Sequence, residues 1–316
     1  MINLSIIIPH YNSVNTLRRL LHSIPNYNDI EVIVVDDRSD LKFKKELKLL
    51  KEKTDLSNLF FFENKSNKKG AGACRNIGLE NARGNWILFA DADDYFLQGF
   101  YQEVKKYFNT EYDVVFFKPT SVDDETGQRT DRHILYADLI NNYMIKNDKY
   151  SELRLKYEFV VPWSKLINAS FIKKNGIKFD NVIASNDVMF STKVGYFMKK
   201  FAASDHIIYC VTRNRGSLTT TLSQEIFESR LNVFIDYYTF LKNHLNEAEF
   251  KLLGLNAWGQ LVESIKFGFI PLFTAFIKLR KNRIPFFELK VLNPFWIIKR
   301  AINVIKKHNK LKKYYK

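Results

Sequence analysis

Short apolar runs alternate with segments of helical spacing through residues 4–94. The runs with strand character are residues 4–9, 30–37, 58–64 and 85–94. The segments with helical spacing, or with a Gly-rich turn that opens a helix, are residues 16–24, 41–53 and 70–84. Strand and helix patterns in this order predict a parallel sheet with helices on both faces.

This regular alternation stops after a fifth predicted strand at residues 113–118. Residues 121–132 have the polar composition of a hairpin or loop, and residues 135–215 mix helical and strand patterns. From Ser223 to the end the pattern is mostly helical. The sequence therefore predicts an α/β domain followed by a helical C-terminal region.

Polar residues follow three of the predicted strands. They are Tyr11 with Asn12, Asp36 with Asp37, and the acids Asp91, Asp93 and Asp94. Ligands of such sheets bind beyond the carboxyl ends of the strands, so a binding site is expected at this edge. The alternative is that these residues only begin turns or cap helices. The three neighbouring carboxylates repel one another, which indicates a positively charged partner.

The positive charge is concentrated in the C-terminal part of the chain. Residues 278–316 hold thirteen Lys or Arg and one Glu, a net charge of +12 out of +15 for the whole chain. The first 277 residues therefore carry about +3. Basic residues interleaved with apolar ones in residues 281–316 predict an amphipathic tail that lies on an anionic membrane surface. A tail packed on the preceding α/β domain with a solvated basic face is the alternative, and nucleic-acid binding is less favoured.

The remaining composition favours an intracellular protein with a large core. The chain is 46% hydrophobic and has two cysteines, Cys74 and Cys210, which indicates a large core and a reducing compartment. The N-terminus has no basic region before its first apolar run, and no apolar run reaches about 18 residues, so neither a signal peptide nor a membrane span is expected.

Five blocks in order resemble glycosyltransferase family 2, the inverting transferases with a GT-A fold. The blocks are SIIIPHYN, VIVVDDRSD, GAGACRNIGLENARGNWILFADADDYF, PWSKLI with KNGIKFD and SNDVMF, and RNRGSLT. The last two resemble acceptor-side elements of the branch that builds bacterial surface polysaccharides. The resemblance implies a mostly parallel, Rossmann-like GT-A sheet at residues 1–222, with a nucleotide-sugar part (1–118) and an acceptor part (119–222). Residues 223–316 would form the helical extension.

The resemblance implies a divalent metal, Mn²⁺ or Mg²⁺, that neutralises the diphosphate of a nucleotide sugar. Asp93 would coordinate the metal, and Asp91 would face the metal or the donor ribose. Asp94 would belong to this group or cap a helix that starts near Leu97. Hard cations of this kind are held by few carboxylates together with phosphate oxygens.

The resemblance also implies a nucleotide site. Tyr11 would stack on the uracil ring, and the carbonyl of Pro9 would lie near the base. Asp37 would hydrogen-bond the base or ribose, and Arg75, after the Gly-rich turn, would lie near the nucleotide. A surface ion pair is the alternative for Arg75.

On the acceptor side, Asp187 matches the position of the base that deprotonates the attacking hydroxyl. The family often has Glu before it, where this chain has Asn186. The alternative for Asp187 is an N-cap. Two further groups are implied for the acceptor or diphosphate: Trp163 with Lys165, and a loop with Arg213, Arg215 and Ser217. A core position for Trp163 and plain surface charge for the arginines are the alternatives.

These features together indicate a cytoplasmic glycosyltransferase, peripheral at the inner face of the cell membrane, that uses a nucleotide sugar, expected to be UDP-linked. The acceptor would be a growing surface glycan or glycolipid such as lipooligosaccharide or capsule. A phosphotransferase with Asp-x-Asp is disfavoured, since its motif belongs near the N-terminal strand and is followed by Thr. A basic membrane- or nucleic-acid-binding module without catalysis would describe the tail alone.

Overall fold

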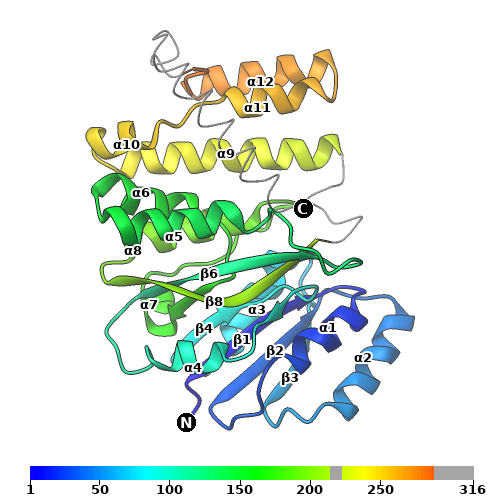
Figure 1. Cartoon of the computed structure of the whole chain (residues 1–316). Helices are drawn as coiled ribbons and strands as arrows, with labels where there is room; N and C mark the ends of the chain where they lie inside the picture. The colour runs from blue at the N-terminus through cyan, green and yellow to red at the C-terminus, as the bar shows by residue number, and fades with distance from the viewer. Residues whose placement is uncertain (214–222, 288–316) are drawn as a thin grey trace. The chain divides into compact units, whose positions relative to one another are not determined.

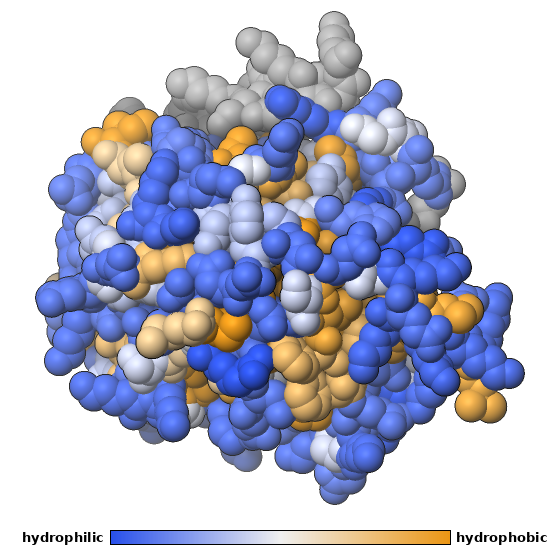
Figure 2. Space-filling model, turned by 90° about the horizontal axis from the view of Figure 1, so that it is seen from below, coloured by the Kyte–Doolittle hydropathy of each residue, from blue (hydrophilic) through white to orange (hydrophobic). Residues whose placement is uncertain are grey.

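The computed structural model describes residues 1–213 and 223–287. These residues form two compact units. The first contains residues 1–128, 132–182 and 186–213, and the second contains residues 129–131, 183–185 and 223–287. Figure 1 shows the elements of both units, and Figure 2 shows the face seen from below, where hydrophilic side chains surround smaller apolar areas.

The first unit is built on one mixed sheet with the strand order β3-β2-β1-β4-β7-β6-β8-β5. Its strands are β1 (Leu4–His10), β2 (Ile30–Asp36), β3 (Leu59–Glu63), β4 (Trp86–Phe89), β5 (Tyr95–Phe96), β6 (Val114–Asp123), β7 (Lys165–Asn168) and β8 (Phe201–Arg213). The first four strands pair in parallel, which confirms the predicted βαβαβαβ start. Beyond them the sheet is mixed, because β7 runs antiparallel to both β4 and β6.

Helices cover both faces of the parallel half. The helices of this unit are α1 (Val14–His22), α2 (Leu41–Lys53), α3 (Ala71–Asn81), α4 (Phe100–Lys105), α5 (Ile134–Lys146), α6 (Lys149–Glu158), α7 (Ala169–Lys174) and α8 (Asn186–Phe197). Val32 and Val34 of β2 share one core with α1 and α2, whereas Ile33 and Val35 pack against Cys74 of α3. This division explains why residues 32–35 of β2 form a continuous apolar run.

Close packing of α3 depends on glycine. A Cβ atom on Gly78 would lie 2.3 Å from Cγ2 of Ile7, and one on Gly72 would lie 2.7 Å from the carbonyl oxygen of Asp180. The Gly-rich turn therefore brings the start of α3 against the chain segment that precedes α8.

Several predicted boundaries were wrong by a few residues, and three of them change the description of this unit. β4 ends at Phe89, so Asp91 and Asp93 follow the strand and do not belong to it. The helix expected near Leu97 begins at Phe100. β6 continues to Asp123, into the predicted polar loop, because its pairing with β8 extends to Arg213.

The second unit is helical. It contains α9 (Gln224–His244), α10 (Glu247–Leu253), α11 (Trp258–Ile265) and α12 (Phe269–Lys281). Its own core is formed by Phe227, Leu231, Ile235, Tyr238, Ala257, Ala275, Leu279 and Ile284. Of the described helices, none has the length and apolar character needed to cross a bilayer.

Candidate active site

The predicted polar residues do meet at one sheet edge. β2, β1 and β4 are neighbours in the sheet, and their carboxyl ends point the same way. Two backbone hydrogen bonds continue the ladder past the strands: Asp37 N donates to His10 O at 2.8 Å, and Ala90 N donates to Ile7 O at 3.1 Å. The segments after the three strands are therefore held side by side.

A buried network that the sequence analysis missed fixes this edge. His10 Nδ1 lies 2.9 Å from Asp36 Oδ1, and Ser39 Oγ donates to the same oxygen at 2.5 Å. The backbone N–H of Ser13 donates to His10 Nε2 at 3.2 Å. Nε2 therefore accepts, and Nδ1 carries the proton toward Asp36. A buried polar residue at the end of the apolar run SIIIPH was the signal available in the sequence.

The residues assigned to the nucleotide have different environments. Asp37 is buried and accepts hydrogen bonds from Asn64 Nδ2 and from the backbone N–H of Gly70, both at 2.7 Å. Tyr11 is 46% exposed, and Lys69 Nζ lies 4.1 Å from its ring centroid. Pro9 is half-buried at its side chain. Asp37 thus orders the turn before α3, while the ring of Tyr11 is accessible to a planar ligand.

Arg75 connects two parts of the site that are distant in the sequence. Its Nη2 donates to Asp91 Oδ1 at 2.5 Å, and its Nη1 donates to Asn186 Oδ1 at 2.8 Å. The side chain is only 6% exposed, so this is not the surface ion pair offered as the alternative. Its Nε has no hydrogen-bond partner in the described chain. Asn186 therefore serves as a neutral acceptor for Arg75 at the start of α8.

Asp94 does not cap a helix, since Gly99 occupies the N-cap of α4. It is buried, and its two oxygens accept from Tyr209 Oη at 2.9 Å and from the backbone N–H of Thr212 at 2.7 Å. Burial raises its pKa well above the ordinary value, and the negative charges of Asp93 and Asp91 add to this rise.

The same β8 residues hold the rest of the turn after β4. The backbone N–H of Asp91 donates to Tyr209 Oη at 2.8 Å, and Thr212 Oγ1 donates to the carbonyl oxygen of Asp93 at 2.6 Å. Tyr209 and Thr212 therefore position Asp91 and Asp93 through contacts that a single sequence does not reveal.

Asp91 and Asp93 fit the chemistry of a hard divalent cation. Both carboxylates are partly accessible, and the two residues lie two positions apart in the segment that follows β4. Within the described ranges, no group of three or more His, Cys, Asp or Glu could hold a metal. Two carboxylates supply fewer oxygens than Mg²⁺ requires, so water or substrate oxygens would complete its shell.

Asp187 is the second residue of α8 and lies in its first turn, so it is not the N-cap of that helix. Burial raises the pKa of its carboxyl group. The positive charges of Arg75 and Lys165 oppose the rise, and the charge of Asp91 adds to it. A carboxylate with a raised pKa has the basicity that proton abstraction needs.

Trp163 and Lys165 both lie in the interior. Trp163 stacks on Tyr209 with ring centroids 5.9 Å apart, which corresponds to the core position named as its alternative. Lys165 Nζ donates to the carbonyl oxygen of Phe159 at 2.5 Å and lies over the ring of that residue. Burial lowers the pKa of Lys165 to about 7, while the charge of Asp187 opposes this shift.

The buried amine predicts a pH-dependent stability. The unfolded amine has a pKa of 10.5, so between pH 7 and 10.5 the unfolded chain binds more protons than the folded chain. The unfolding free energy should then rise with pH, by ~1.4 kcal/mol per unit from this group. Lys165→Met should remove this slope, as measured by urea unfolding at several pH values.

Lys174→Met is the matched control, because Lys174 is exposed and should leave the slope unchanged. Parallel stability curves for wild type and Lys165→Met would show that the amine of Lys165 does not titrate in this range.

Arg213 is the last residue of β8 and is exposed. Arg215, Ser217 and residues 288–316 of the predicted tail lie outside the described residues.

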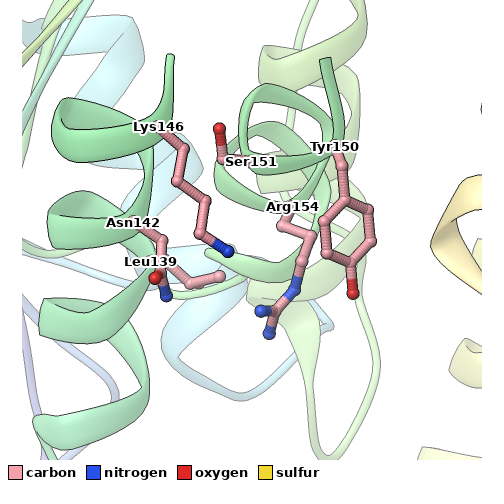
Figure 3. A pocket seen from close by; sticks show the side chains of 6 residues that line it. All are labelled: Leu139, Asn142, Lys146, Tyr150, Ser151 and Arg154. Atoms are coloured by element: carbon pink, nitrogen blue, oxygen red, sulfur yellow. The ribbon is translucent and has the colours of Figure 1, made fainter. Parts of the chain in front are cut away.

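Some pockets of the described chain lie away from this edge. The pocket between α5 and α6 is lined by Leu139, Asn142, Lys146, Tyr150, Ser151 and Arg154 (Figure 3). Its volume of about 10 Å³ accommodates no more than a water molecule. A larger pocket of about 470 Å³ lies between α3 and α7 and contains none of the predicted site residues.

Two curated bacterial glycosyltransferases are similar to this chain in sequence. Glycosyltransferase GlyA of Streptococcus pneumoniae is 26% identical over 248 residues, which cover 76% of this chain and 35% of GlyA. The poly(ribitol-phosphate) beta-glucosyltransferase of Bacillus spizizenii is 29% identical over 226 residues, 67% of this chain and 33% of that enzyme. The chain thus spans about a third of the length of these two relatives.

Among solved structures, Staphylococcus aureus TarS 1-349 in complex with UDP-GlcNAc matches with a TM-score of 0.64. Its sequence identity is 23%, and the match covers 80% of this chain and 71% of that chain. This likeness confirms the predicted GT-A fold. Residues 5–176, more than half of the 316, match the family described as Glycosyl transferase family 2. The chain is therefore a member of glycosyltransferase family 2.

Proposed function

We propose that this chain transfers a sugar from a UDP-linked donor to a hydroxyl group of a bacterial surface polymer, with inversion at the anomeric carbon. One observation carries the proposal: Arg75 bonds both Asp91, in the turn after β4, and Asn186, which precedes Asp187. A donor-side carboxylate and the residue next to the candidate base thereby share one buried guanidinium. The family membership and the relatives, which act on poly(ribitol-phosphate) or bind UDP-GlcNAc, support the choice of substrates.

Donor binding is assigned to the edge formed by β1, β2 and β4. The accessible ring of Tyr11 would stack on uracil, and the ordered turn behind Asp37 would border the ribose. Asp93 and Asp91 would hold Mg²⁺ or Mn²⁺. The ion, when bound, supplies Lewis-acid stabilisation of the charge on the departing nucleotide. Asp91 already pairs with Arg75. Binding of the donor and its metal would therefore either displace Arg75 from Asp91 or leave Asp91 in contact with both.

The transfer step is assigned to Asp187. Its carboxylate takes the proton of the acceptor hydroxyl while the oxygen attacks the anomeric carbon from the face opposite the diphosphate. The new glycosidic bond forms, the bond to the diphosphate oxygen breaks, and UDP leaves with the electron pair. The positive charges of Arg75 and Lys165 oppose the pKa rise of Asp187 and so favour its ionised form, which is the form that accepts a proton.

The remaining assignments stay proposals: residues 1–222 as the catalytic domain, and a peripheral position at the inner face of the cell membrane. The tail of residues 281–316 as a membrane anchor is a separate proposal, because most of it lies outside the described residues.

A panel of UDP-, GDP-, CDP- and dTDP-sugars, assayed for nucleotide release with and without a polyol-phosphate or glycan acceptor, tests the function. We expect release of UDP from one UDP-sugar, stimulated by an acceptor, and a product whose anomeric configuration, read by NMR, is inverted.

Preference for a GDP-sugar would overturn the donor assignment, and a product with retained configuration would overturn the inverting step. The variant Asp93→Asn serves as the inactive control.

A further inference from the structure

The last two described helices have an apolar surface that the helical core does not use. On α12, Pro271, Ala275 and Leu279 are buried. The exposed large apolar residues are Trp258, Val262 and Ile265 on α11 and Phe269, Ile270, Phe273, Phe276 and Ile277 on α12. We call these eight residues the α11–α12 apolar surface; α11 and α12 pack against each other (Figure 1).

Exposure of this surface is large. Phe269 and Ile270 are 79% and 78% exposed, and Ile265 is 60% exposed. A helix that is apolar on both its inner and its outer side is typical of a buried helix or of one in contact with lipid. α12 has 13 residues, which correspond to about 20 Å of helix and are too few to span a hydrocarbon core of about 30 Å.

Cations flank the apolar surface. Residues 258–287 contain five Lys or Arg and one Glu, a net charge of +4. Lys266 follows α11, and Arg280, Lys281 and Arg283 cluster at the end of α12, all four exposed. In the described part of the chain, Glu263 pairs with Arg230 and not with these four.

Charge distinguishes the partners that could cover this surface. Residues 288–316 carry nine Lys or Arg and one Glu, a net charge of +8, and a second copy of this chain would present the same +4. Both would be repelled by the cationic flanks. An anionic surface would be attracted to them.

Polarity then distinguishes lipid from an acidic protein. Protein interfaces carry about one hydrogen bond per 100–200 Å². Between Phe269 and Ile277, Thr274 is the sole residue with a polar side chain. Phe and Ile with few polar groups, Trp at one end and Lys or Arg at the margins form the pattern of a segment that lies in the headgroup region.

We propose that the α11–α12 apolar surface binds the surface of an anionic phospholipid bilayer, with Phe269, Ile270 and Phe273 inserted between lipids. The flanking cations contact the headgroups. This binding is independent of sugar transfer. It places a membrane contact on a folded surface that shares only its last cations, Lys281 and Arg283, with the tail of residues 281–316 and does not require residues 288–316.

Sedimentation of the full chain with phosphatidylcholine vesicles, with and without phosphatidylglycerol, tests the proposal. Wild type should bind the anionic vesicles, with affinity reduced by salt. Ile270→Glu combined with Phe273→Glu should lower the partition coefficient by at least about tenfold, because a charge replaces inserted apolar area at two exposed positions. The paired substitutions Leu41→Glu and Ile145→Glu, at exposed positions of α2 and α5, should have no effect.

Any of four other results would overturn the proposal. Equal binding of the Ile270/Phe273 double variant and wild type would exclude this surface. Loss of binding on deleting residues 288–316, with no effect of the double variant, would assign it to the tail. Equal binding to neutral and anionic vesicles would remove the role of the cations. A dimer in light scattering that the double variant abolishes, without vesicle binding, would show that a second copy covers the surface.

Discussion

Asp93→Asn is expected to reduce the turnover of sugar transfer by at least about a thousandfold, or about 4 kcal/mol of transition-state stabilisation. The amide replaces one of the two accessible carboxylates after β4, so a divalent cation loses a charged oxygen ligand. The variant should stay folded, because the anchoring hydrogen bond from Thr212 is made to the backbone carbonyl of residue 93, which Asn retains. Steady-state turnover at saturating donor, with unfolding followed in parallel, measures both effects.

Removing the metal from the wild type should lower turnover as the Asp93→Asn substitution does. EDTA should abolish transfer by the wild type, and Mn²⁺ or Mg²⁺ should restore it, whereas neither ion should rescue Asp93→Asn. Asp205→Asn, at an exposed position of β8, is the control and should retain normal turnover. Full activity of Asp93→Asn in EDTA would remove the metal from the proposed mechanism.

Asp187→Asn should lower turnover by at least about a hundredfold, because a general base contributes about 10²–10⁴-fold. Donor binding should remain near normal. Stability should be unchanged or higher, since burial raises the pKa of this carboxyl group and thus disfavours its ionised form. The sign follows from linkage: a folded acid with a raised pKa binds extra protons, so its contribution to stability falls as pH rises through the unfolded and folded pKa values. Turnover, donor affinity and urea unfolding at two pH values measure the three effects.

The pH profile offers a second test of the same residue. The acid limb of kcat/KM should lie above the ordinary range of an aspartate, in the direction of its raised pKa, and activity should fall as pH drops below it. Asp205→Asn is the control, because Asp205 is exposed on β8 and has no proposed role in proton transfer. Turnover of Asp187→Asn within about threefold of wild type would move the search for a base to Asp180 or Asp94.

Local patterns were sufficient for the parallel half of the fold. β2 is buried along its whole length, and the β-branched apolar residues 32–35 were sufficient to predict a buried strand there. The helix at residues 41–53 was predicted with its observed bounds, because its apolar spacing is helical and the segments on either side do not continue that spacing. The sheet edge where Asp37 and Asp91 meet followed from strand order alone, because parallel strands place their carboxyl ends on one side.

The mixed half could not be predicted from such patterns. β7 is four residues long and pairs antiparallel with β4 and β6, which come from distant parts of the chain. A short strand carries little periodicity, and its direction depends on partners rather than on its own residues.

The sequence by itself determined the chemistry available: the carboxylates after β4, the base candidate Asp187, the aromatic side chain of Tyr11 after the first strand and the excess of cations near the C-terminus. Tertiary structure decided their roles. It buried Asp94 as an anchor for Tyr209 and Thr212, joined Asp91 to Asn186 through Arg75, and left Phe269 and Ile270 exposed beside cations. The physical reason is that desolvation and charge pairing depend on contacts between residues far apart in sequence, which residue type and spacing do not specify.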